Sequence, residues 1–85
     1  MPKTIFGGEL RHLVAVLVEA RQASGLTQAE LAARVGKDQS FVSIIERGQR
    51  RVDVLEFVAL ARAMDIEPTH LFERVARRLS RALRI

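Results

Sequence analysis

Apolar residues recur every three or four positions along most of the chain, and short stretches containing glycine, aspartate or proline separate the runs. This spacing places apolar side chains on one face of an α-helix. The runs cover residues 9–24, 28–35, 39–47, 53–64 and 68–83. Glycine follows the first three, as it does at many helix C-termini, and Pro68 suits the first position of the last. The pattern predicts an all-α protein with five helices.

Two stretches carry the sequence signature of a capped helix start. Thr27 and Asp53 each precede a glutamate by three residues, Glu30 and Glu56 respectively. In each pair the two side chains can satisfy each other's backbone amides. Asp38 is in addition predicted to cap the helix that follows it.

The two short runs over residues 28–35 and 39–47 meet the demands of a helix-turn-helix. Counted from Gln28, the fifth position must be small where the helices cross, and Ala32 is there. The ninth must turn the chain with a positive φ, which Gly36 does without steric cost. The positions that lock the two helices together must be apolar, and they are Leu31, Val35, Val42 and Ile45. All of these demands are met together.

The segment from Thr27 to Gly48, TQAELAARVG through SFVSIIERG, resembles the λ-repressor and Cro type of bacterial helix-turn-helix regulators, the xenobiotic response element (XRE) family. The resemblance extends from about Leu13 to about Phe72. It implies a five-helix, λ-repressor-like DNA-binding domain with the helix-turn-helix at its second and third helices. It also implies a transcriptional regulator that binds a palindromic double-stranded DNA operator as a homodimer.

The second helix of such a pair enters the major groove with its N-terminal residues toward the base edges. The side opposite its apolar locking residues carries the candidate base contacts, Gln39, Ser40, Ser43 and Ile44. Gln39 can make a bidentate amide contact to adenine, the serines can reach several acceptors, and Ile44 can touch a thymine methyl. Many family members have a polar or basic residue where Ile44 stands, so packing of Ile44 within the protein is the alternative.

Residues around this helix are candidates for contacts to DNA phosphates, which position a protein without reading sequence. The candidates are Gln28, Lys37, Arg47, Gln49, Arg50 and Arg51. No acid interrupts the arginines before Asp53, so the loop after the helix forms a local positive patch. Gln28 starts a helix, where free amides favour an anion, and the resemblance implies a phosphate contact there. A merely solvated loop is the alternative.

The resemblance also implies an ion pair between an arginine of the first helix and a glutamate at the end of the recognition helix. Arg21 and Glu46 occupy those places. A bidentate pair would orient the recognition helix on the rest of the domain. It would add little net stability, because burial of the charges costs desolvation. Two separately solvated side chains are the alternative.

The first predicted helix has more apolar surface than one buried face needs, because Val14, Val16 and Val18 surround its stripe. Near the end of the last predicted helix, Leu79 and Leu83 stand among the five arginines of residues 74–84. A candidate seam therefore consists of Val14, Val18, Leu79 and Leu83. It joins either the last and first helices of one chain or two copies of the chain. We expect Leu79 or Leu83 to be buried by a partner copy or by the first helix.

Composition narrows the class of partner. Fourteen Lys and Arg against ten Asp and Glu give a net charge of +4, which suits an anionic partner such as DNA. Cysteine is absent, which excludes disulfides and thiolate sites and suits a reducing cytoplasm. The longest uncharged apolar run, residues 13–18, is too short to span a membrane, and no cleavable signal opens the chain. We expect a cytoplasmic protein.

Eighty-five residues fit one domain, predicted over residues 9–85. Residues 1–8 lack periodicity and end in two glycines, which predicts a flexible arm. His12 and His70 are the only histidines, and neither has a carboxylate at a metal-ligand spacing. We expect no metal, no cofactor, no small-molecule ligand and no enzymatic activity. The alternative to a DNA-binding regulator is a protein-interaction module of the same fold, such as an antitoxin subunit or a co-regulator. DNA retention that falls with salt distinguishes the two.

Overall fold

The structure is a computed structural model that describes residues 8–84, and over these residues it consists of five α-helices and no strand. The helices are α1 (Leu10–Ala23), α2 (Gln28–Arg34), α3 (Gln39–Glu46), α4 (Val54–Ala63) and α5 (Pro68–Arg78). The predicted all-α fold with five helices is confirmed. The predicted arm falls almost wholly on residues 1–7, which lie outside the described residues.

Local side-chain signals explain where α2 and α4 begin. The Thr27 hydroxyl accepts the Glu30 amide at 3.0 Å, and the Glu30 carboxylate accepts the Thr27 amide at 2.9 Å. Asp53 and Glu56 form the same reciprocal pair at 2.7 and 3.1 Å. Asp38 occupies the N-cap position of α3, but its carboxylate makes no capping hydrogen bond. The predicted N-cap position of Asp38 is confirmed, and its carboxylate accepts the neighbouring Ser40 hydroxyl at 2.6 Å.

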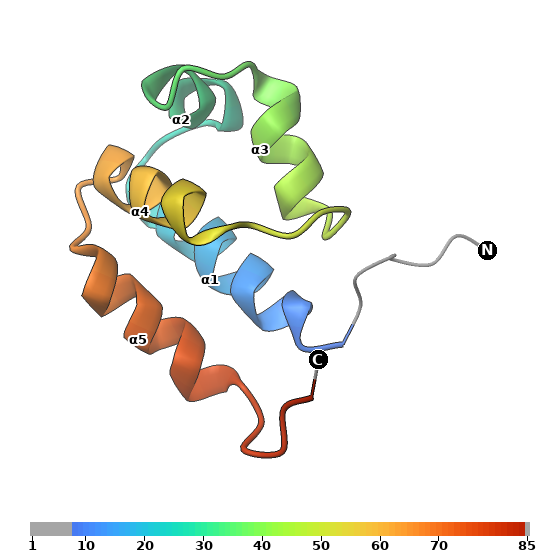
Figure 1. Cartoon of the computed structure of the whole chain (residues 1–85). Helices are drawn as coiled ribbons and strands as arrows, with labels where there is room; N and C mark the ends of the chain where they lie inside the picture. The colour runs from blue at the N-terminus through green and yellow to red at the C-terminus, as the bar shows by residue number, and fades with distance from the viewer. Residues whose placement is uncertain (1–7, 85) are drawn as a thin grey trace.

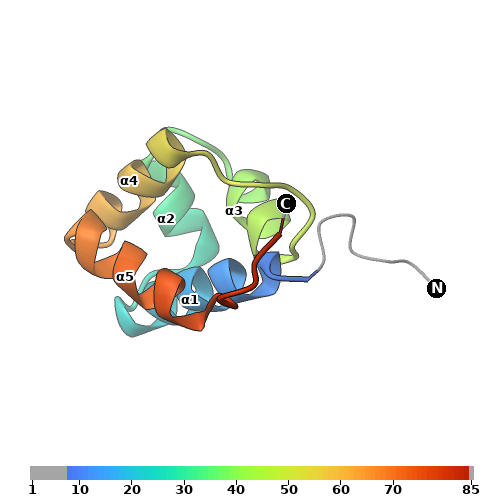
Figure 2. The ribbon, with the colours of Figure 1, turned by 60° about the horizontal axis from the view of Figure 1, so that its bottom comes forward.

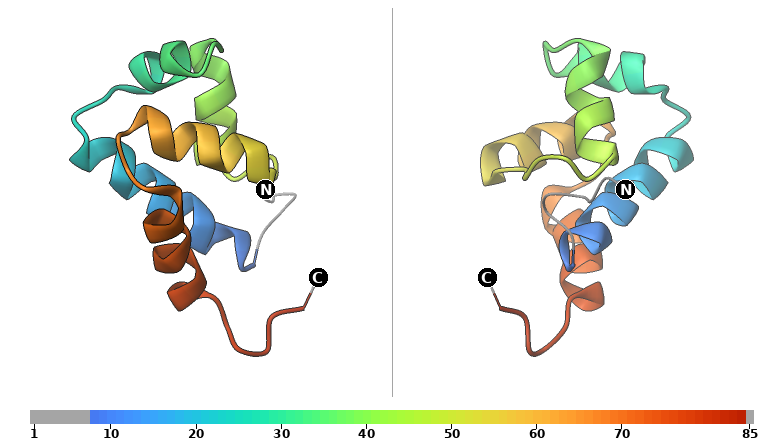
Figure 3. Two further views of the ribbon diagram at one scale, coloured as in Figure 1. Left: turned by 60° about the vertical axis from the view of Figure 1, so that its left-hand side comes forward. Right: turned by 90° about the vertical axis from the view of Figure 1, so that its right-hand side faces the viewer.

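The helix-turn-helix pair and α5 lie at different ends of the molecule. α2 packs against α3 at one end, and α5 packs against α1 and α4 at the other (Figures 1 and 3). Figure 2 shows the five helices arranged around one interior. This arrangement leaves one side of α3 on the outside of the molecule.

One apolar cluster fills the interior and receives side chains from every helix. Its members are Val16, Leu17, Ala20, Leu31, Ala32, Val42, Ile45, Phe57, Leu60, Ala61, Met64, Leu71 and Val75. Val16, which the sequence pattern made surplus, is fully buried. Val54 and Phe72, which have the helical spacing of core residues, are 76% and 60% exposed. Val54 is in the first turn of α4 and lines an open groove beside Phe57, so its side chain stays largely exposed.

α5 is shorter than predicted, because it ends at Arg78 and not near residue 83. The backbone of Leu79 is extended, with φ −79° and ψ 146°. The Ser80 amide donates to the Glu9 carboxylate at 3.0 Å, which ties this segment to the start of α1. Leu79 packs at the margin of the core, whereas Leu83 is 43% exposed. The two leucines therefore do not share one helical stripe.

Gly36 makes the turn between α2 and α3. Its φ is +75°, a left-handed conformation that costs residues with a Cβ about 1–2 kcal/mol. A Cβ there would meet no atom within 4 Å, so the cost comes from the backbone alone. In urea denaturation we expect Gly36→Ala to lower the free energy of unfolding by about 1–2 kcal/mol. Gly36→Asn should lower it less, because asparagine adopts this conformation more readily. Equal stability of the alanine variant and the wild type would contradict this account of the turn.

Candidate nucleic-acid interface

α3 has one face in the core and one face outside. Its two apolar locking residues, Val42 and Ile45, are buried. Among the predicted base contacts, Gln39 and Ser40 are exposed, and Ser43 and Ile44 are half-buried. The outer face therefore presents its most accessible polar side chains at the N-terminal end of the helix.

A chain of hydrogen bonds leads from the exposed Gln39 into the domain. Gln39 Nε2 donates to Gln28 Oε1 at 3.2 Å, and Gln28 Nε2 donates to Glu46 Oε1 at 2.8 Å. Glu46 in turn accepts from Arg21 of α1. Side chains from three helices therefore hold the amide of Gln39 at the start of α3.

The ion pair at the inner end of this chain is bidentate and largely buried. Arg21 Nε lies 2.6 Å from Glu46 Oε2, and Arg21 Nη2 lies 3.0 Å from Glu46 Oε1. The side chains are 13% and 8% exposed. Arg21 Nη1 also donates to the Leu26 carbonyl at 2.8 Å. The hydrogen bond to Glu46 raises the pKa of Arg21 further above its usual range. The structure thus contains the pair that the resemblance implies.

The two serines among the predicted base contacts are oriented by their neighbours. The Ser40 hydroxyl donates to Asp38 Oδ1 at 2.6 Å, and this hydrogen bond lowers the pKa of the Asp38 carboxyl. Arg47 Nη1 donates to the Ser43 hydroxyl at 2.8 Å, and Arg47 Nε donates to Gln49 Oε1 at 3.2 Å. Asp38, for which the sequence predicted only a capping role, is therefore also part of the polar surface at the start of α3.

The basic loop between α3 and α4 holds its arginines in different settings. Arg51 is exposed. Arg50 points to α4, where its two terminal nitrogens donate to the Glu56 carboxylate at 3.1 and 3.0 Å. Its guanidinium lies over the Phe41 ring, and the ammonium of Lys37 lies over the same ring. Arg50, predicted to contact phosphate, is thus directed toward the protein.

The valines of the candidate seam lie on one face of α1, and Glu19, which forms an ion pair with α5, lies on another. Val14 and Val18 are half-buried, and their spacing places them on the same helical face as Arg21, which reaches α3. Glu19, on another face, accepts from Arg78 of α5 at 2.8 Å. Val16 lies next to the face of α1 that carries Glu19, and its side chain is completely buried.

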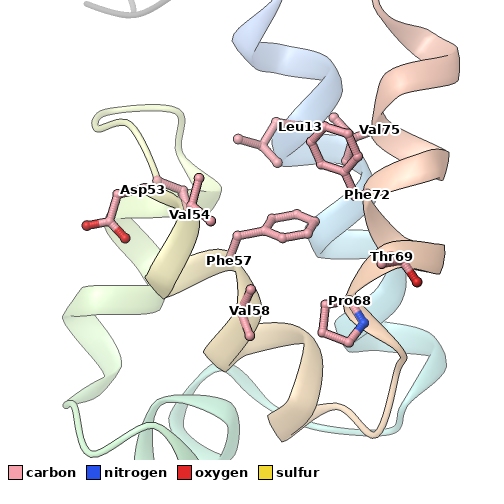
Figure 4. A pocket seen from close by; sticks show the side chains of 10 residues that line it. Leu13, Asp53, Val54, Phe57, Val58, Pro68, Thr69, Phe72 and Val75 are labelled. Carbon is pink, nitrogen blue, oxygen red and sulfur yellow. The ribbon is translucent and has the colours of Figure 1, made fainter.

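An apolar groove lies between α4, α5 and the N-terminal half of α1 (Figure 4). Its volume is about 370 Å³, and its lining includes Leu13, Val54, Phe57, Val58, Phe72 and Val75. The rings of Phe57 and Phe72 meet edge to face, with centroids 6.2 Å apart. The sequence pattern did not predict this groove. No local pattern marks it, because its lining comes from three helices that are far apart in the sequence.

Two other kinds of feature, metal sites and membrane-spanning helices, were sought among the residues that the structure describes. No group of three or more histidine, cysteine, aspartate or glutamate side chains gathers there as a metal site. Within residues 8–84, no helix is both long and apolar enough to cross a membrane.

Comparisons with known proteins match this geometry to a family. The Helix-turn-helix family model matches residues 17–71, more than half of the chain. An uncharacterized HTH-type transcriptional regulator of Sinorhizobium fredii, y4dL, is 43% identical over 56 residues, 66% of this chain. An XRE-family like protein from Pseudomonas syringae shares the fold with a TM-score of 0.77 and 42% identity, over 85% of this chain and 88% of that one. The chain belongs to the XRE type of helix-turn-helix proteins.

The segment that the family model matches contains all the residues that the hydrogen bonds link, which are Arg21, Glu46, Gln28 and Gln39. The restriction-modification controller protein C.AhdI from Aeromonas hydrophila has a similar structure, with 46% identity and a TM-score of 0.68 over 74% of this chain and 96% of that one. The chain spans only 29% of the length of y4dL. Phe72 and Val75 of the groove lie outside the segment that the family model matches.

Proposed function

We propose that this XRE-type protein binds double-stranded DNA sequence-specifically and regulates transcription, with the N-terminal end of α3 in the major groove. The hydrogen-bonded chain that ends at Gln39 carries the proposal. It pre-positions an exposed amide, the group that pairs with the edge of adenine. A side chain that is already ordered loses less entropy when it binds.

Polar and charged residues around α3 supply the part of the binding that does not depend on sequence. Lys37 lies in the turn before α3, and Arg47 and Arg51 follow it, so exposed cations flank both ends of the helix. Contacts of such cations to phosphates position a protein on the duplex. Gln28 and Gln49 are further candidates for phosphate contacts.

Retention on immobilised duplex DNA across a salt series tests this proposal. We expect retention that falls as salt rises, because phosphate binding releases counterions. Selection of bound fragments from random DNA then gives the preferred site, for which we expect two-fold symmetry. No DNA binding at low salt would reject the proposal and favour a protein-interaction module. Binding without any preferred sequence would reject only the proposal that α3 reads bases.

Gln39→Ala is expected to weaken binding to the selected site by about 1–3 kcal/mol and to relax the preference at one base position. The reason is the loss of one bidentate contact to a base edge. Binding to random DNA should change little. Electrophoretic mobility shifts on the site and on its single-base variants measure both effects. Equal losses on the site and on random DNA would show that Gln39 reads no base.

Arg51→Ala is expected to weaken binding to every DNA sequence. The slope of log K against log salt should fall by about one unit, because one fewer counterion is released. Titrations of the selected site and of random DNA at four salt concentrations measure the slope. An unchanged slope would remove Arg51 from the phosphate contacts.

We further propose that the protein binds a palindromic operator as a two-fold homodimer. One recognition helix reads only a few base pairs, and two helices about 34 Å apart read successive turns of the major groove. A two-fold interface needs a surface that is complementary to itself. The apolar groove and the exposed Val54 and Phe72 at its margin offer a hollow and protruding apolar groups on one surface.

This surface replaces Leu79 and Leu83 as the proposed interface. Leu79 is already packed against the core, and Leu83 lies beyond the end of α5. The lining of the groove comes from α1, α4, α5 and the residues next to them, and none of it from α3. Pairing through the groove therefore leaves the outer face of both recognition helices available to DNA.

A further inference from the structure

Phe41 of α3 carries two cations over its ring. Lys37 Nζ lies 5.6 Å from the ring centroid, and Arg50 Cζ lies 5.3 Å from it. Both distances are within the range of cation–π attraction. Lys37 belongs to the turn before α3, and Arg50 belongs to the loop after it. One aromatic side chain therefore links the two segments that flank the recognition helix.

Glu56 fixes the Arg50 end of this link. Both terminal nitrogens of Arg50 donate to the Glu56 carboxylate, at 3.1 and 3.0 Å. The same carboxylate accepts the Asp53 amide at the start of α4. The hydrogen bonds from Arg50 lower the pKa of Glu56, so the carboxylate is ionised at neutral pH. Arg50 is thereby held between α4 and the Phe41 ring.

We propose that Phe41, Arg50 and Glu56 are positioning residues of the DNA interface. They hold Lys37 and the α3–α4 loop in the arrangement that brings the exposed cations of both segments to the phosphates, and Arg50 acts through the protein and not at a phosphate. This role rests on the DNA binding proposed above. The proposed role makes an unusual prediction about charge. The Glu56 carboxylate should favour DNA binding, although its negative charge by itself repels DNA.

The variant Glu56→Gln tests whether the Glu56 carboxylate favours DNA binding. Glutamine can keep the hydrogen bond to the helix start, but it loses the charge and thereby raises the net charge by one. We expect affinity for the selected site to fall about three- to tenfold, equal to about 0.6–1.4 kcal/mol, with an unchanged salt slope. Glu73→Gln is the matched control. It raises the net charge equally, but Glu73 pairs with Arg77 within α5, so we expect no loss of affinity.

Variants of Phe41 distinguish the contribution of its ring face, which the cations contact, from the contribution of its apolar packing. Leucine and tyrosine both keep an apolar body at the margin of the core, but only tyrosine keeps a ring face for the cations. Phe41→Leu should lose about as much affinity as Glu56→Gln, and Phe41→Tyr should bind like the wild type. Arg50→Ala should lower affinity without the decrease of about one unit in salt slope that Arg51→Ala produces.

Three results would overturn this role: tighter binding by Glu56→Gln than by the wild type, unchanged binding by Phe41→Leu, or a salt slope reduced by one unit in Arg50→Ala. Circular dichroism and urea denaturation establish that each variant folds. The wild type is measured in the same series. If it binds no DNA, the proposed function fails and this role fails with it. If it binds and any of the three results appears, this role fails alone.

Discussion

Replacement of Val54 and Phe72 together by glutamate is expected to yield a folded monomer with at least about 100-fold lower operator affinity. Both side chains are mostly exposed in the single chain, so the fold should tolerate the charges. Across a two-fold interface the change removes four apolar side chains, each contributing about 1.5–3 kcal/mol when fully buried. A monomer reads one half-site, and a tenfold loss corresponds to about 1.4 kcal/mol. Light scattering measures the mass, and mobility shifts measure the affinity.

Leu55→Glu is the matched control for the mass measurement. Leu55 is 80% exposed on the same helix but does not line the groove. This variant should remain a dimer. A wild-type protein that is monomeric at concentrations where it occupies DNA, one copy per site, would reject the dimer and leave the role of α3 intact. Dimerisation that survives the double substitution would place the interface elsewhere.

Arg21→Ala is expected to lower the free energy of unfolding by about 3 kcal/mol, because it leaves the largely buried carboxylate of Glu46 without its cation. The loss is a large part of the stability of a small domain, which is on the order of 5–15 kcal/mol. Urea denaturation measures it. A loss below about 1 kcal/mol, as at exposed ion pairs, would show that Glu46 is solvated in solution.

A double variant separates the stability of this pair from its orienting role. Arg21→Met combined with Glu46→Leu replaces two charges by apolar groups, a change that is often close to neutral for stability. It also removes the acceptor that holds Gln28, and through Gln28 the support of Gln39. We expect near wild-type stability with about tenfold weaker binding to the selected site, equal to about 1.4 kcal/mol. Full specific affinity in this variant would show that the chain of hydrogen bonds does not orient Gln39.

The helix-turn-helix could be predicted because its requirements are local. The capping box at Thr27 sets the start of α2, and Gly36 sets its end through the sign of one backbone angle. The small Ala32 permits the crossing with α3 and is buried as required. The pair of Arg21 and Glu46 is not local, and it was expected only through the family resemblance.

The features that were missed depend on contacts between distant parts of the chain. α5 ends early beside a hydrogen bond from Ser80 to Glu9, 71 positions away. Val54 and Phe72 have the spacing of core residues, but their burial depends on how α5 passes α4, which the spacing does not specify. Arg50 stands in a basic run that is typical of phosphate contacts. Its direction is set by a carboxylate that the pattern assigned only to capping.

The hydrogen bond between Ser80 and Glu9 also makes the two ends of the helical domain neighbours. Figure 1 shows both of these ends away from the N-terminal end of α3. Domains whose ends lie close together tolerate circular permutation and insertion into other chains. A short linker from residue 84 to residue 8 should therefore give a permuted protein with the same five helices. A second domain fused at either end would leave on the same side and keep clear of the recognition helix, so the fold is suited to modular reuse.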